Sequence, residues 1–371
     1  MISTFSNSFK IKWCVVLILI ISLSSCKKQA EEIKTQATVA TMDSVSQFES
    51  NLLSHKIDSL IKDLRFNGTI SIKKGQFILY EKSRGLENFQ NSQKLDSASL
   101  FAIGSVSKQL TSTLILKAFQ NQKLDLTDSL SKFIAPLPSA QWENITIHQL
   151  LTHSSGISDG SNKLAFKPGT DYLYSNEGYN LLGEIASKVE NKTLDELYSG
   201  LFAQAEMKSA STPNQLTNRR FASAYTWAGK DPVEVNNMPK RLLSSSIGLA
   251  AGGVLSSVRD LHAWNENLYG GKIIPPNLLE LMQQTYQRTH HYILNEIGYG
   301  YGIMSRLNPP HSHMHTGYVK GSASLLIYYP KSQTSVVVLS NLVEERLGKK
   351  HIFEIHQEVR EFCDLLEISR L

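Results

Sequence analysis

Two strand hairpins, one near each end of the chain, most constrain how this sequence can fold. Residues 68–73 and 76–81 form one pair of strand-like runs, and residues 324–329 and 334–339 form the other. The long stretch between the two pairs has mostly helical patterning. The sequence therefore predicts an α+β fold, in which an antiparallel sheet built from both termini is flanked by helices and carries an inserted, mostly helical lobe.

The patterning divides the 371 residues into four parts. Residues 1–25 are predicted to be a signal peptide, residues 26–42 a polar tether, residues 43–345 the main domain with its helical lobe over roughly 106–290, and residues 346–371 a C-terminal helix that packs on the sheet. A cleft between the sheet and the helical lobe is the expected place for a small-molecule site.

The N-terminus has the pattern of a secretory signal. Lys10 and Lys12 precede an apolar run from Trp13 to Leu23, which is followed by two serines. The run has 11 residues, well short of the ~20 that span a bilayer as a helix. The alternative of a transmembrane anchor is therefore disfavoured by length.

Cys26 follows these serines directly, and the segment resembles the lipobox of bacterial lipoproteins. The resemblance implies cleavage before Cys26, acylation of its sulfur, and a location in the bacterial cell envelope, lipid-anchored to a membrane on the periplasmic or outer surface. Of the other two cysteines, Cys14 lies inside the apolar run, which leaves Cys363. No disulfide framework is expected.

The charge balance excludes one large class of function. The formal net charge is +5, and the two lysines of the signal segment account for part of it. The chain has no dense stripe of Lys and Arg with interleaved aromatic residues, which is the usual footprint of a nucleic-acid surface. The sequence therefore predicts no nucleic-acid partner.

Ser105 and Lys108 stand at the start of a long helical pattern over residues 109–120. A spacing of three puts both side chains on one face of a helix. A serine hydroxyl needs a base within hydrogen-bond reach to act as a nucleophile, and a lysine can serve when burial lowers its pKa. Alone the pair is a weak signal, because most such pairs are a helix cap and a solvated lysine.

Two further motifs carry polar groups suited to acyl transfer. Tyr174 and Asn176 follow a turn and precede a helical stretch; a tyrosine beside a lysine can share a proton, and an asparagine can bind a substrate amide. His315-Thr316-Gly317 enters the strand-rich C-terminal region. There the N–H of Tyr318, with that of Ser105, would form a two-donor oxyanion hole. Each motif alone also fits an ordinary core or turn.

Taken together, these three motifs resemble the serine β-lactamase/penicillin-binding-protein superfamily, in its class C-like branch. Other stretches resemble the family in the same order along the chain, over roughly residues 66–342. They are Phe66-Asn67-Gly68-Thr69, Leu124-Asp125-Leu126-Thr127-Asp128, the segment 150–157, the segment 251–257, and Gly321 with Ser324. The resemblance implies a β-lactamase/transpeptidase-like fold without a cofactor.

The resemblance also implies the catalytic roles. Ser105 would be the acylated nucleophile, and Lys108 and Tyr174 would activate it and relay protons to the leaving group and from the hydrolytic water. Asn176 would orient the substrate amide. His153, which lies in a turn of the family pattern, is expected to be structural.

The third motif is implied to bind the substrate, with four residues lining the site: His315, Thr316, Gly317 and Tyr318. Class C β-lactamases usually carry lysine in place of this histidine, which is mostly neutral at pH 7. Family members often have phenylalanine where this chain has Ser322, which leaves the local wall of the site open.

Histidine at the third motif is more similar to D-alanyl-D-alanine carboxypeptidases and D-amino-acid-specific peptidases of the superfamily. The resemblance therefore implies a cell-envelope serine hydrolase that forms an acyl-enzyme on Ser105. Its substrates would be D-amino-acid peptides, including peptidoglycan stem peptides, or related esters and amides. One alternative is a class C-like β-lactamase. Another, from a different class, is a non-catalytic protein that binds or senses peptidoglycan or a β-lactam on the same fold.

The remaining histidines suggest a weaker alternative. His311, His313 and His315 alternate, so they would share one face of a strand and could bind zinc. No carboxylate lies nearby in sequence and the last histidine already fits the hydrolase motif, so no metal is expected. His290 and His291 are expected to be a solvated loop pair.

Overall fold

The computed structural model describes residues 44–62, 64–217 and 220–370. The predicted signal peptide, the tether and the acylation site Cys26 lie outside these residues. The chain divides into two compact units between His55 and Lys56, and the described part of the first unit is helical. In the described ranges, no helix is both long enough and apolar enough to cross a lipid bilayer.

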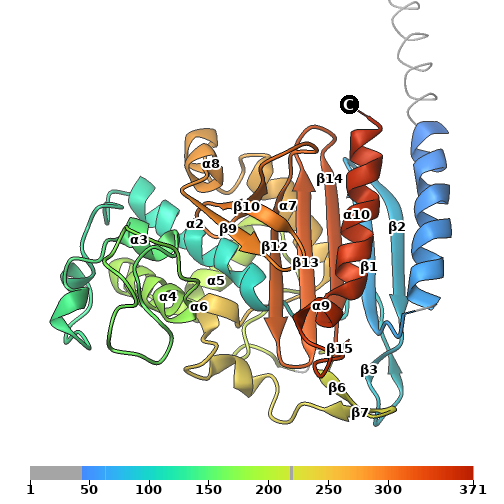
Figure 1. Ribbon diagram of the computed structural model, residues 1–371, viewed down its shortest axis with the longest axis horizontal. Helices are drawn as coiled ribbons and strands as arrows, with labels where there is room; N and C mark the ends of the chain where they lie inside the picture. Colours follow the sequence, from blue (N-terminus) through green and yellow to red (C-terminus); the bar gives the residue numbers. More distant parts are fainter. Residues whose placement is uncertain (1–43, 63, 218–219, 371) are drawn as a thin grey trace, which may run out of the picture. The chain divides into compact units, whose positions relative to one another are not determined.

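The second unit is organised around a large antiparallel sheet. Within the described residues the sheet has eight strands in the order β2-β1-β14-β13-β12-β11-β10-β9 (Figure 1). In chain order they are β1 Gly68–Lys74, β2 Phe77–Arg84, β9 Gln287–His291, β10 Asn295–Tyr299, β11 Met304–Arg306, β12 His313–Val319, β13 Ser322–Tyr329 and β14 Thr334–Ser340. Ile70 of β1 lies opposite Val338 of β14. The prediction of a sheet built from both termini is confirmed.

Helices cover both faces of this sheet. Side chains alternate between the two faces of a strand, and two neighbouring residues of β14 contact different helices. The Ser335 hydroxyl bonds His262 of α7 (Val258–Tyr269), whereas Thr334 accepts from Arg370, just beyond α10 (Glu354–Ile368). Figure 1 shows α10 in front of the sheet and α7 behind it. At β14 both faces of the sheet are therefore covered, and every residue of this strand is buried.

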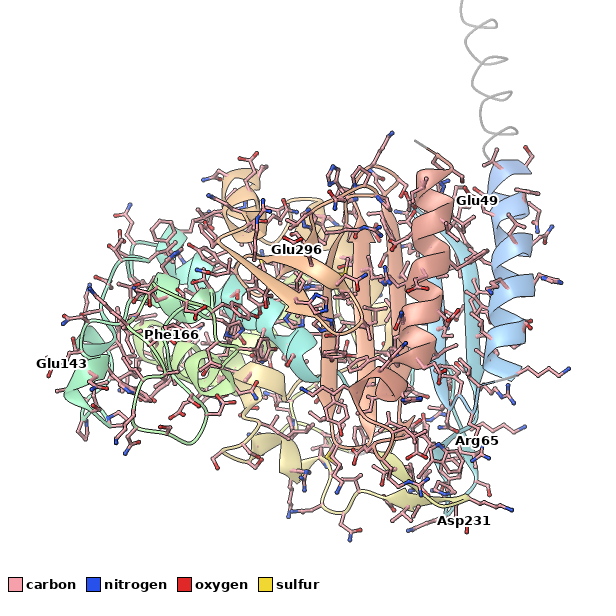
Figure 2. All side chains as sticks on the ribbon, viewed as in Figure 1. Glu49, Arg65, Glu143, Phe166, Asp231 and Glu296 are labelled. Carbon is pink, nitrogen blue, oxygen red and sulfur yellow. The ribbon has the colours of Figure 1, made fainter. Side chains whose placement is uncertain are left out.

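The helical lobe follows β5 (Phe101–Ala102) and packs around α2 (Ser107–Gln120), which is buried along most of its length. Figure 2 labels Glu143 and Phe166 on this lobe and Glu296 on β10. The other helices of the lobe are α3 Ile147–Leu151, α4 Asn176–Glu190, α5 Leu194–Gln204, α6 Leu249–Gly252 and α8 Pro276–Gln283, with 3₁₀ turns η1 Gly104–Val106, η2 Leu130–Lys132, η3 Ala140–Trp142 and η4 Lys240–Leu243.

Short strands pair outside the large sheet. In the part of the chain that the structure describes, these form three small sheets, β3-β4, β5-β8 and β15-β6-β7. Their members are β3 Leu86–Asn88, β4 Gln93–Lys94, β6 Tyr225–Ala228, β7 Asp231–Glu234, β8 Leu255–Ser256 and β15 Leu342–Val343. The chain after β15 continues through α9 (Lys349–Ile352) before it enters α10. The predicted C-terminal helix is thus interrupted at Phe353.

The end of the helical lobe differs from the prediction. The lobe was expected to reach roughly residue 290, and in the structure β9 already begins at Gln287 and belongs to the large sheet. His290 and His291 are the last residues of this strand, and His291 is buried rather than solvated. The sequence of β9 is polar throughout, so no alternation of apolar and polar residues marked it as a strand.

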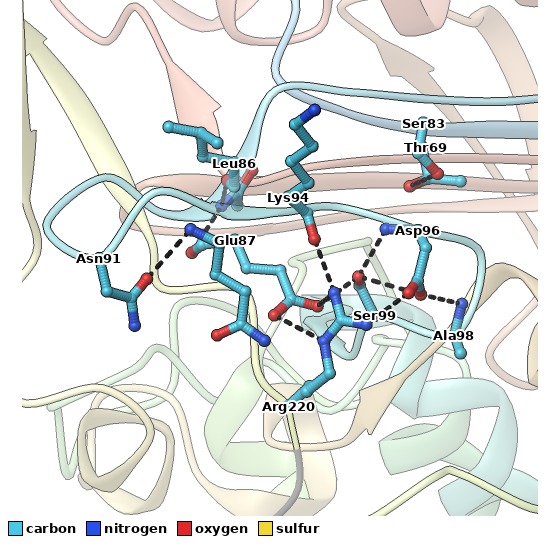
Figure 3. A network of polar contacts seen from close by, with 12 residues as sticks. Thr69, Ser83, Leu86, Glu87, Asn91, Lys94, Asp96, Ala98, Ser99 and Arg220 are labelled. Carbon is cyan, nitrogen blue, oxygen red and sulfur yellow. Dashed lines mark hydrogen bonds and ion pairs between the residues drawn. The ribbon is translucent and has the colours of Figure 1, made fainter.

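An ion-pair network around one buried carboxylate holds the segment that leads to β5. The carboxylate of Glu87 is almost fully buried and contacts two nitrogens of Arg220, at 3.0 and 2.9 Å. The same guanidinium also binds Asp96, and Ser99 donates to Glu87 (Figure 3). A bidentate arginine pair is directional, so the network fixes residues 94–99 immediately before the strand that carries the next part of the chain into the site.

Candidate active site

Ser105 lies in the 3₁₀ turn between β5 and α2, and the residue just before this turn, Ile103, is hydrogen-bonded on two sides. The N–H of Ile103 donates to the carbonyl of Val254 at 3.1 Å. The carbonyl of Ile103 accepts from the Ser324 hydroxyl of β13 at 2.7 Å. These bonds hold the turn between the helical lobe and the sheet, so the Ser105 hydroxyl has a defined position.

Lys108 is fully buried one helical turn after Ser105. Its ammonium nitrogen Nζ lies 3.1 Å from Ser105 Oγ, 2.9 Å from Asn176 Oδ1 and 2.7 Å from the carbonyl oxygen of Ala251. Burial lowers the pKa of Lys108 to about 7, and the more distant charge of Asp159 partly opposes this shift. A substantial fraction of the side chain is therefore a neutral amine at pH 7.

Asn176 reaches Lys108 because it is the first residue of α4. Ser175 is the N-cap of this helix, and its hydroxyl accepts from the N–H of Gly178. Asp159 fixes this end from outside: its carboxylate accepts from the Ser175 hydroxyl at 3.0 Å and from the N–H of Glu177 at 2.9 Å. The second motif is thus placed by a capped helix start.

Tyr174 completes the group around the nucleophile. Its ring centroid lies 4.7 Å from Lys108 Nζ and 4.2 Å from the ring of His153. Burial raises the pKa of the Tyr174 hydroxyl well above its ordinary value, and a hydrogen bond with Ser105 offsets part of the rise. The hydroxyl is therefore protonated at neutral pH.

The third motif divides between the two sides of β12. Alternation along a strand puts Thr316 and Tyr318 on one face and His315 and Gly317 on the other. Thr316 and Tyr318 line the cavity that contains Ser105, whereas His315 is fully buried behind them. His315 and Gly317 were also expected to line the site, but the structure places neither residue in the cavity wall.

Gly317 has a different function in the structure, which is close packing. A Cβ atom there would lie 1.9 Å from the carbonyl oxygen of Ile103, and one on Gly104 would lie 2.6 Å from the backbone nitrogen of Tyr318. Only glycine permits this approach, and Gly104 also has a positive φ of 51°. The two glycines bring the Ser105 turn against β12, where the N–H groups of Ser105 and Tyr318 are expected to form the oxyanion hole.

A chain of hydrogen bonds behind the cavity joins the second motif to the third. The N–H of Ser175 donates to His153 Nδ1 at 3.1 Å, so His153 Nε2 carries the ring hydrogen and donates to the Tyr299 hydroxyl at 3.1 Å. His315 Nδ1 lies 2.6 Å from the carbonyl oxygen of Thr316, so Nδ1 is the donor there. His315 Nε2 then accepts from Tyr299 at 3.2 Å.

Both imidazole rings in this series of hydrogen bonds, those of His153 and His315, are neutral. Burial lowers the pKa of His315 to about 3 and holds that of His153 well below its ordinary value. Every bond in the chain is consistent with one neutral tautomer at each ring. His153 was expected to have a structural role, and its hydrogen-bond partners are the N–H of Ser175 and the hydroxyl of Tyr299.

The cavity in front of this series of hydrogen bonds has a volume of about 400 Å³. Besides Ser105, Tyr174 and Asn176, its lining includes Thr316 and Tyr318 from β12. The rest of the lining comes from β9 to β12, from α6, from the segments just before α4 and α6, and from the segment around α9. It comprises Tyr172, Ile247, Ala251, Gly252, Thr289, His290, His291, Tyr292, Ile297, Met304, Val319, Lys349, Ile352 and Phe353. Among the described residues, no aspartate or glutamate contributes to this lining.

A family comparison identifies the class of protein that carries this arrangement. The model of the beta-lactamase family matches residues 60–359, which is most of the chain. This chain belongs to the beta-lactamase family. The family groups serine hydrolases with penicillin-binding proteins, and the fold agrees with the resemblance inferred from the motifs.

Individual members of the beta-lactamase family are distant in sequence. Penicillin-binding protein 4* of Bacillus subtilis (strain 168) is 25% identical over 332 residues, which cover 80% of this chain and 72% of that protein. Protein flp of Staphylococcus aureus (strain N315) is 25% identical over 309 residues, covering 76% of this chain and 60% of that protein. The chain thus spans less than two thirds of the second relative.

A solved structure shows the same fold. The D-amino acid amidase from Ochrobactrum anthropi SV3, complexed with L-phenylalanine amide, superposes with a TM-score of 0.73 at 20% identity. The match covers 87% of this chain and 99% of the amidase. The α+β, β-lactamase/transpeptidase-like fold predicted from the sequence is confirmed.

Three features of this beta-lactamase-family site were not foreseen. Tyr299 bridges the two histidines, the carbonyl oxygen of Ala251 binds Lys108, and His291 donates to the Thr316 hydroxyl at 3.1 Å. Ser322, where the wall was uncertain, is buried and bonds the carbonyl of Ala102 at 3.0 Å. Ser322 thus links β13 of the large sheet to β5, the strand before Ser105, and does not line the cavity.

The zinc alternative gains no support from the arrangement of the histidines. Within the described ranges no group of three or more His, Cys, Asp or Glu side chains is placed to hold a metal ion. His313 instead bonds the Ser305 hydroxyl at 3.0 Å and stacks on Tyr269. His315, which is on β12 like His313, instead bonds the hydroxyl of Tyr299 on β10.

Proposed function

We propose that this protein is a serine hydrolase that forms an acyl-enzyme on Ser105 and acts on peptides ending in D-amino acids, in the manner of a D-alanyl-D-alanine carboxypeptidase. The observation that carries the proposal is the 3.1 Å contact between Lys108 Nζ and Ser105 Oγ, in a site where burial lowers the lysine pKa to about 7. A general base works best when its pKa lies near the operating pH.

The two carbonyl contacts of Lys108 direct its lone pair. A neutral amine has two N–H groups, and the oxygens of Asn176 and Ala251 can only accept. These two acceptors take both hydrogens, so the lone pair faces the third neighbour, the Ser105 hydroxyl. Lys108 is therefore poised to remove the serine proton.

Acylation then follows with all protons accounted for. Ser105 Oγ bonds to the substrate carbonyl carbon while its proton passes to Lys108, and the two backbone N–H groups of Ser105 and Tyr318 stabilise the oxyanion. The C–N bond breaks, and the leaving amine takes a proton from the Tyr174 hydroxyl, which Lys108 replenishes. The protonated state of Tyr174 suits it to this donation.

Deacylation reverses the proton path. A water molecule loses a proton to Lys108 as its oxygen attacks the ester carbonyl of the acyl-enzyme. The intermediate collapses, the bond to Ser105 Oγ breaks, and the proton returns to the serine. The products are a free carboxylic acid and the original enzyme.

The substrate class rests on the third motif and on the relatives. Neutral His315 behind the cavity replaces the lysine that class C β-lactamases usually carry, which favours peptides over β-lactams. The solved D-amino acid amidase shares the fold, and Penicillin-binding protein 4* is a sequence relative. The D-amino acids named for the amidase are consistent with a D-configured substrate for this chain.

The test is turnover of a panel containing a D-Ala-D-Ala peptide, nitrocefin and a short-chain p-nitrophenyl ester. We expect the peptide to be hydrolysed fastest, Ser105→Ala to abolish turnover, and mass spectrometry of the wild type to find the acyl group on the peptide that contains Ser105. Ser199→Ala, on α5 and away from the cavity, is the control. Faster nitrocefin turnover would indicate a β-lactamase, and stable acylation without turnover would indicate a sensor.

We also propose that the protein acts in the bacterial cell envelope, held to a membrane by acylated Cys26. The signal pattern ending in Ser24-Ser25-Cys26 supports this. Metabolic labelling with a palmitate analogue should mark the wild type and a Cys14→Ser variant, but not Cys26→Ser. Equal labelling of Cys26→Ser would contradict the anchor and leave the hydrolase proposal intact.

A further inference from the structure

We propose that a second cavity, beside β15 and α9, binds a free amino acid with an apolar side chain. The cavity has a volume of about 300 Å³. Of the residues that the structure describes, only Ile352 lines both this cavity and the one that contains Ser105. The second cavity is therefore a separate site, and the inference goes beyond the hydrolysis proposed at Ser105.

Most of the lining of the second cavity is apolar. It includes Phe66, Trp227, Leu342, Val343, Leu347 and Ile355. The volume lies at the lower end of the range for small-molecule sites, which is about 300–1,000 Å³. Leu347 is 61% exposed, so a ligand that covers it removes apolar surface from water. The cavity is thus suited to a small aliphatic or aromatic group.

The lining also carries two opposite charges that have no ion-pair partner. Among the described residues, no group of opposite charge lies within 4.0 Å of the Arg65 guanidinium or of the Glu354 carboxylate, although both residues line the cavity. The two side chains therefore do not pair with each other. A free amino acid offers what both lack, a carboxylate for Arg65 and an ammonium group for Glu354.

The guanidinium of Arg65 lies over the ring of Trp227, which comes from β6. Its central carbon is 5.2 Å from the ring centroid, a distance at which a cation is attracted to an aromatic face. Glu344 lines the same cavity, but its two carboxylate oxygens accept from the Arg346 guanidinium at 2.9 and 2.8 Å. Within the described part of the chain the N–H groups of Arg65 have no acceptor, so they are available to a ligand carboxylate.

Two acceptors for the ammonium group come from α9 and α10. Glu354 is the first residue of α10, and its carboxylate can only accept hydrogen bonds. His351 of α9 also lines the cavity, and its Nδ1 donates to the carbonyl of Leu347 at 2.9 Å. The neutral ring therefore has Nε2 as an acceptor. The polar groups of the lining thus match the two charged ends of an amino acid, with donors from Arg65 and acceptors from these two helices.

Trp227 supplies the readout for binding. It is half-buried in the wall of this cavity, whereas Trp142 and Trp264 are fully buried in the core. Racemic leucine, titrated into the purified chain, should change the tryptophan fluorescence to saturation, with a Kd in about the millimolar range for a ligand of this size. Isocaproate lacks the ammonium group of leucine, and isoamylamine lacks the carboxylate. Each analogue should bind about three- to fivefold more weakly than leucine.

Two variants assign the charges. Glu354→Gln should lower the affinity for leucine to that for isocaproate, and Arg65→Gln should lower it to that for isoamylamine. Lys62→Gln and Glu358→Gln are the matched controls, because these two residues do not line the cavity. Both controls should bind leucine as the wild type does.

The absence of a saturable fluorescence change, or equal affinity for leucine and both analogues, would overturn the inference. A response that persists in Trp227→Phe would also overturn it, because the ligand would then lie elsewhere. Ser105→Ala should bind leucine with unchanged affinity, whereas a loss of binding in that variant would place the ligand in the catalytic cavity. The amino-acid site and the proposed hydrolase can therefore fail independently.

Discussion

The floor and the rim of the cavity differ in their contact with water. We define the floor as the buried groups Lys108, His153, Tyr299 and His315 with the half-buried Asn176, and the rim as the more exposed groups Tyr292, Tyr318 and Lys349. The polar atoms of the floor side chains bond to one another or to backbone. Tyr318 is 38% exposed and Tyr292 39% exposed, and both can be reached by water.

This difference separates the residues that carry out the reaction from the residues that select the substrate. A lysine becomes a base at pH 7 only when it is removed from water, and its buried polar neighbours must then be satisfied by protein groups. A group that binds the substrate has the opposite need, because it must exchange water for ligand. Rate should therefore depend on the floor, and discrimination between substrates on the rim.

The largest expected effect is at Lys108, the base of the floor. Lys108→Met should lower kcat by about 10²- to 10⁴-fold, because it removes proton transfer. Lys117→Met, on the same helix but directed towards Gln204, should keep nearly full activity. Steady-state kinetics on a D-Ala-D-Ala peptide measures both. Comparable losses in the two variants would show that burial of Lys108 carries no special function.

The same base predicts the pH profile. Its pKa is lowered to about 7, so the amine is neutral and competent above that pH and protonated below it. The value of kcat/KM should fall about tenfold for each pH unit below 7. Lys117→Met should retain this profile. A flat response between pH 5 and pH 9 would rule out Lys108 as the group that titrates.

The next effect concerns the packing that joins the floor to β12. Gly317→Ala places a Cβ 1.9 Å from the Ile103 carbonyl oxygen, so the strand must move away from Ser105. We expect a loss of about 10²- to 10³-fold in kcat from the misplaced oxyanion donor. Gly200→Ala, in α5 with open space around it, should be neutral or slightly stabilising in thermal unfolding.

A smaller effect tests the bridge between the two histidines. Tyr299→Phe removes one hydroxyl and should lower kcat about tenfold with little change in KM, because the motifs lose their link but the base remains. Tyr301→Phe removes a partly buried tyrosine–histidine bond, 2.8 Å long, to His148 and serves as the control. If both variants lose activity equally, the bridge has only a general structural role.

The smallest effect lies on the rim. Tyr318→Phe removes the hydroxyl that binds Glu345 while its backbone N–H stays in place. We expect kcat to change by less than about threefold, measured with the same peptide. A loss as large as that of Tyr299→Phe would erase the distinction between floor and rim.

The sequence allowed prediction of the parts of the site that depend on local spacing. Ser105 and Lys108 are three residues apart on one helix, so their contact follows from helical geometry alone. Asn176 was placed by a helix start that the N-cap serine confirms. The strand hairpins at both ends were likewise marked by turn residues and alternation.

Other parts carried no signal in the sequence. The group of Ala251 that accepts from Lys108 is a backbone carbonyl. Every residue has one, so the residue type gives no indication of this contact. Lys349 stands beside Lys350 in a polar stretch, and only the fold shows which of them faces the cavity. The burial of His315, by contrast, was predictable, because alternation along a strand that exposes Thr316 to the cavity must turn its neighbour away.

The position of β14 has a consequence for the order in which the protein is made. This strand lies between β1 and β13, and its Val338 pairs with Ile70, which leaves the ribosome long before it. The central sheet cannot close until almost the whole chain has been synthesised, and contacts so distant in sequence form slowly. During that interval the edge of β1 is unpaired, so the growing chain depends on some other protection against aggregation until its last strand arrives.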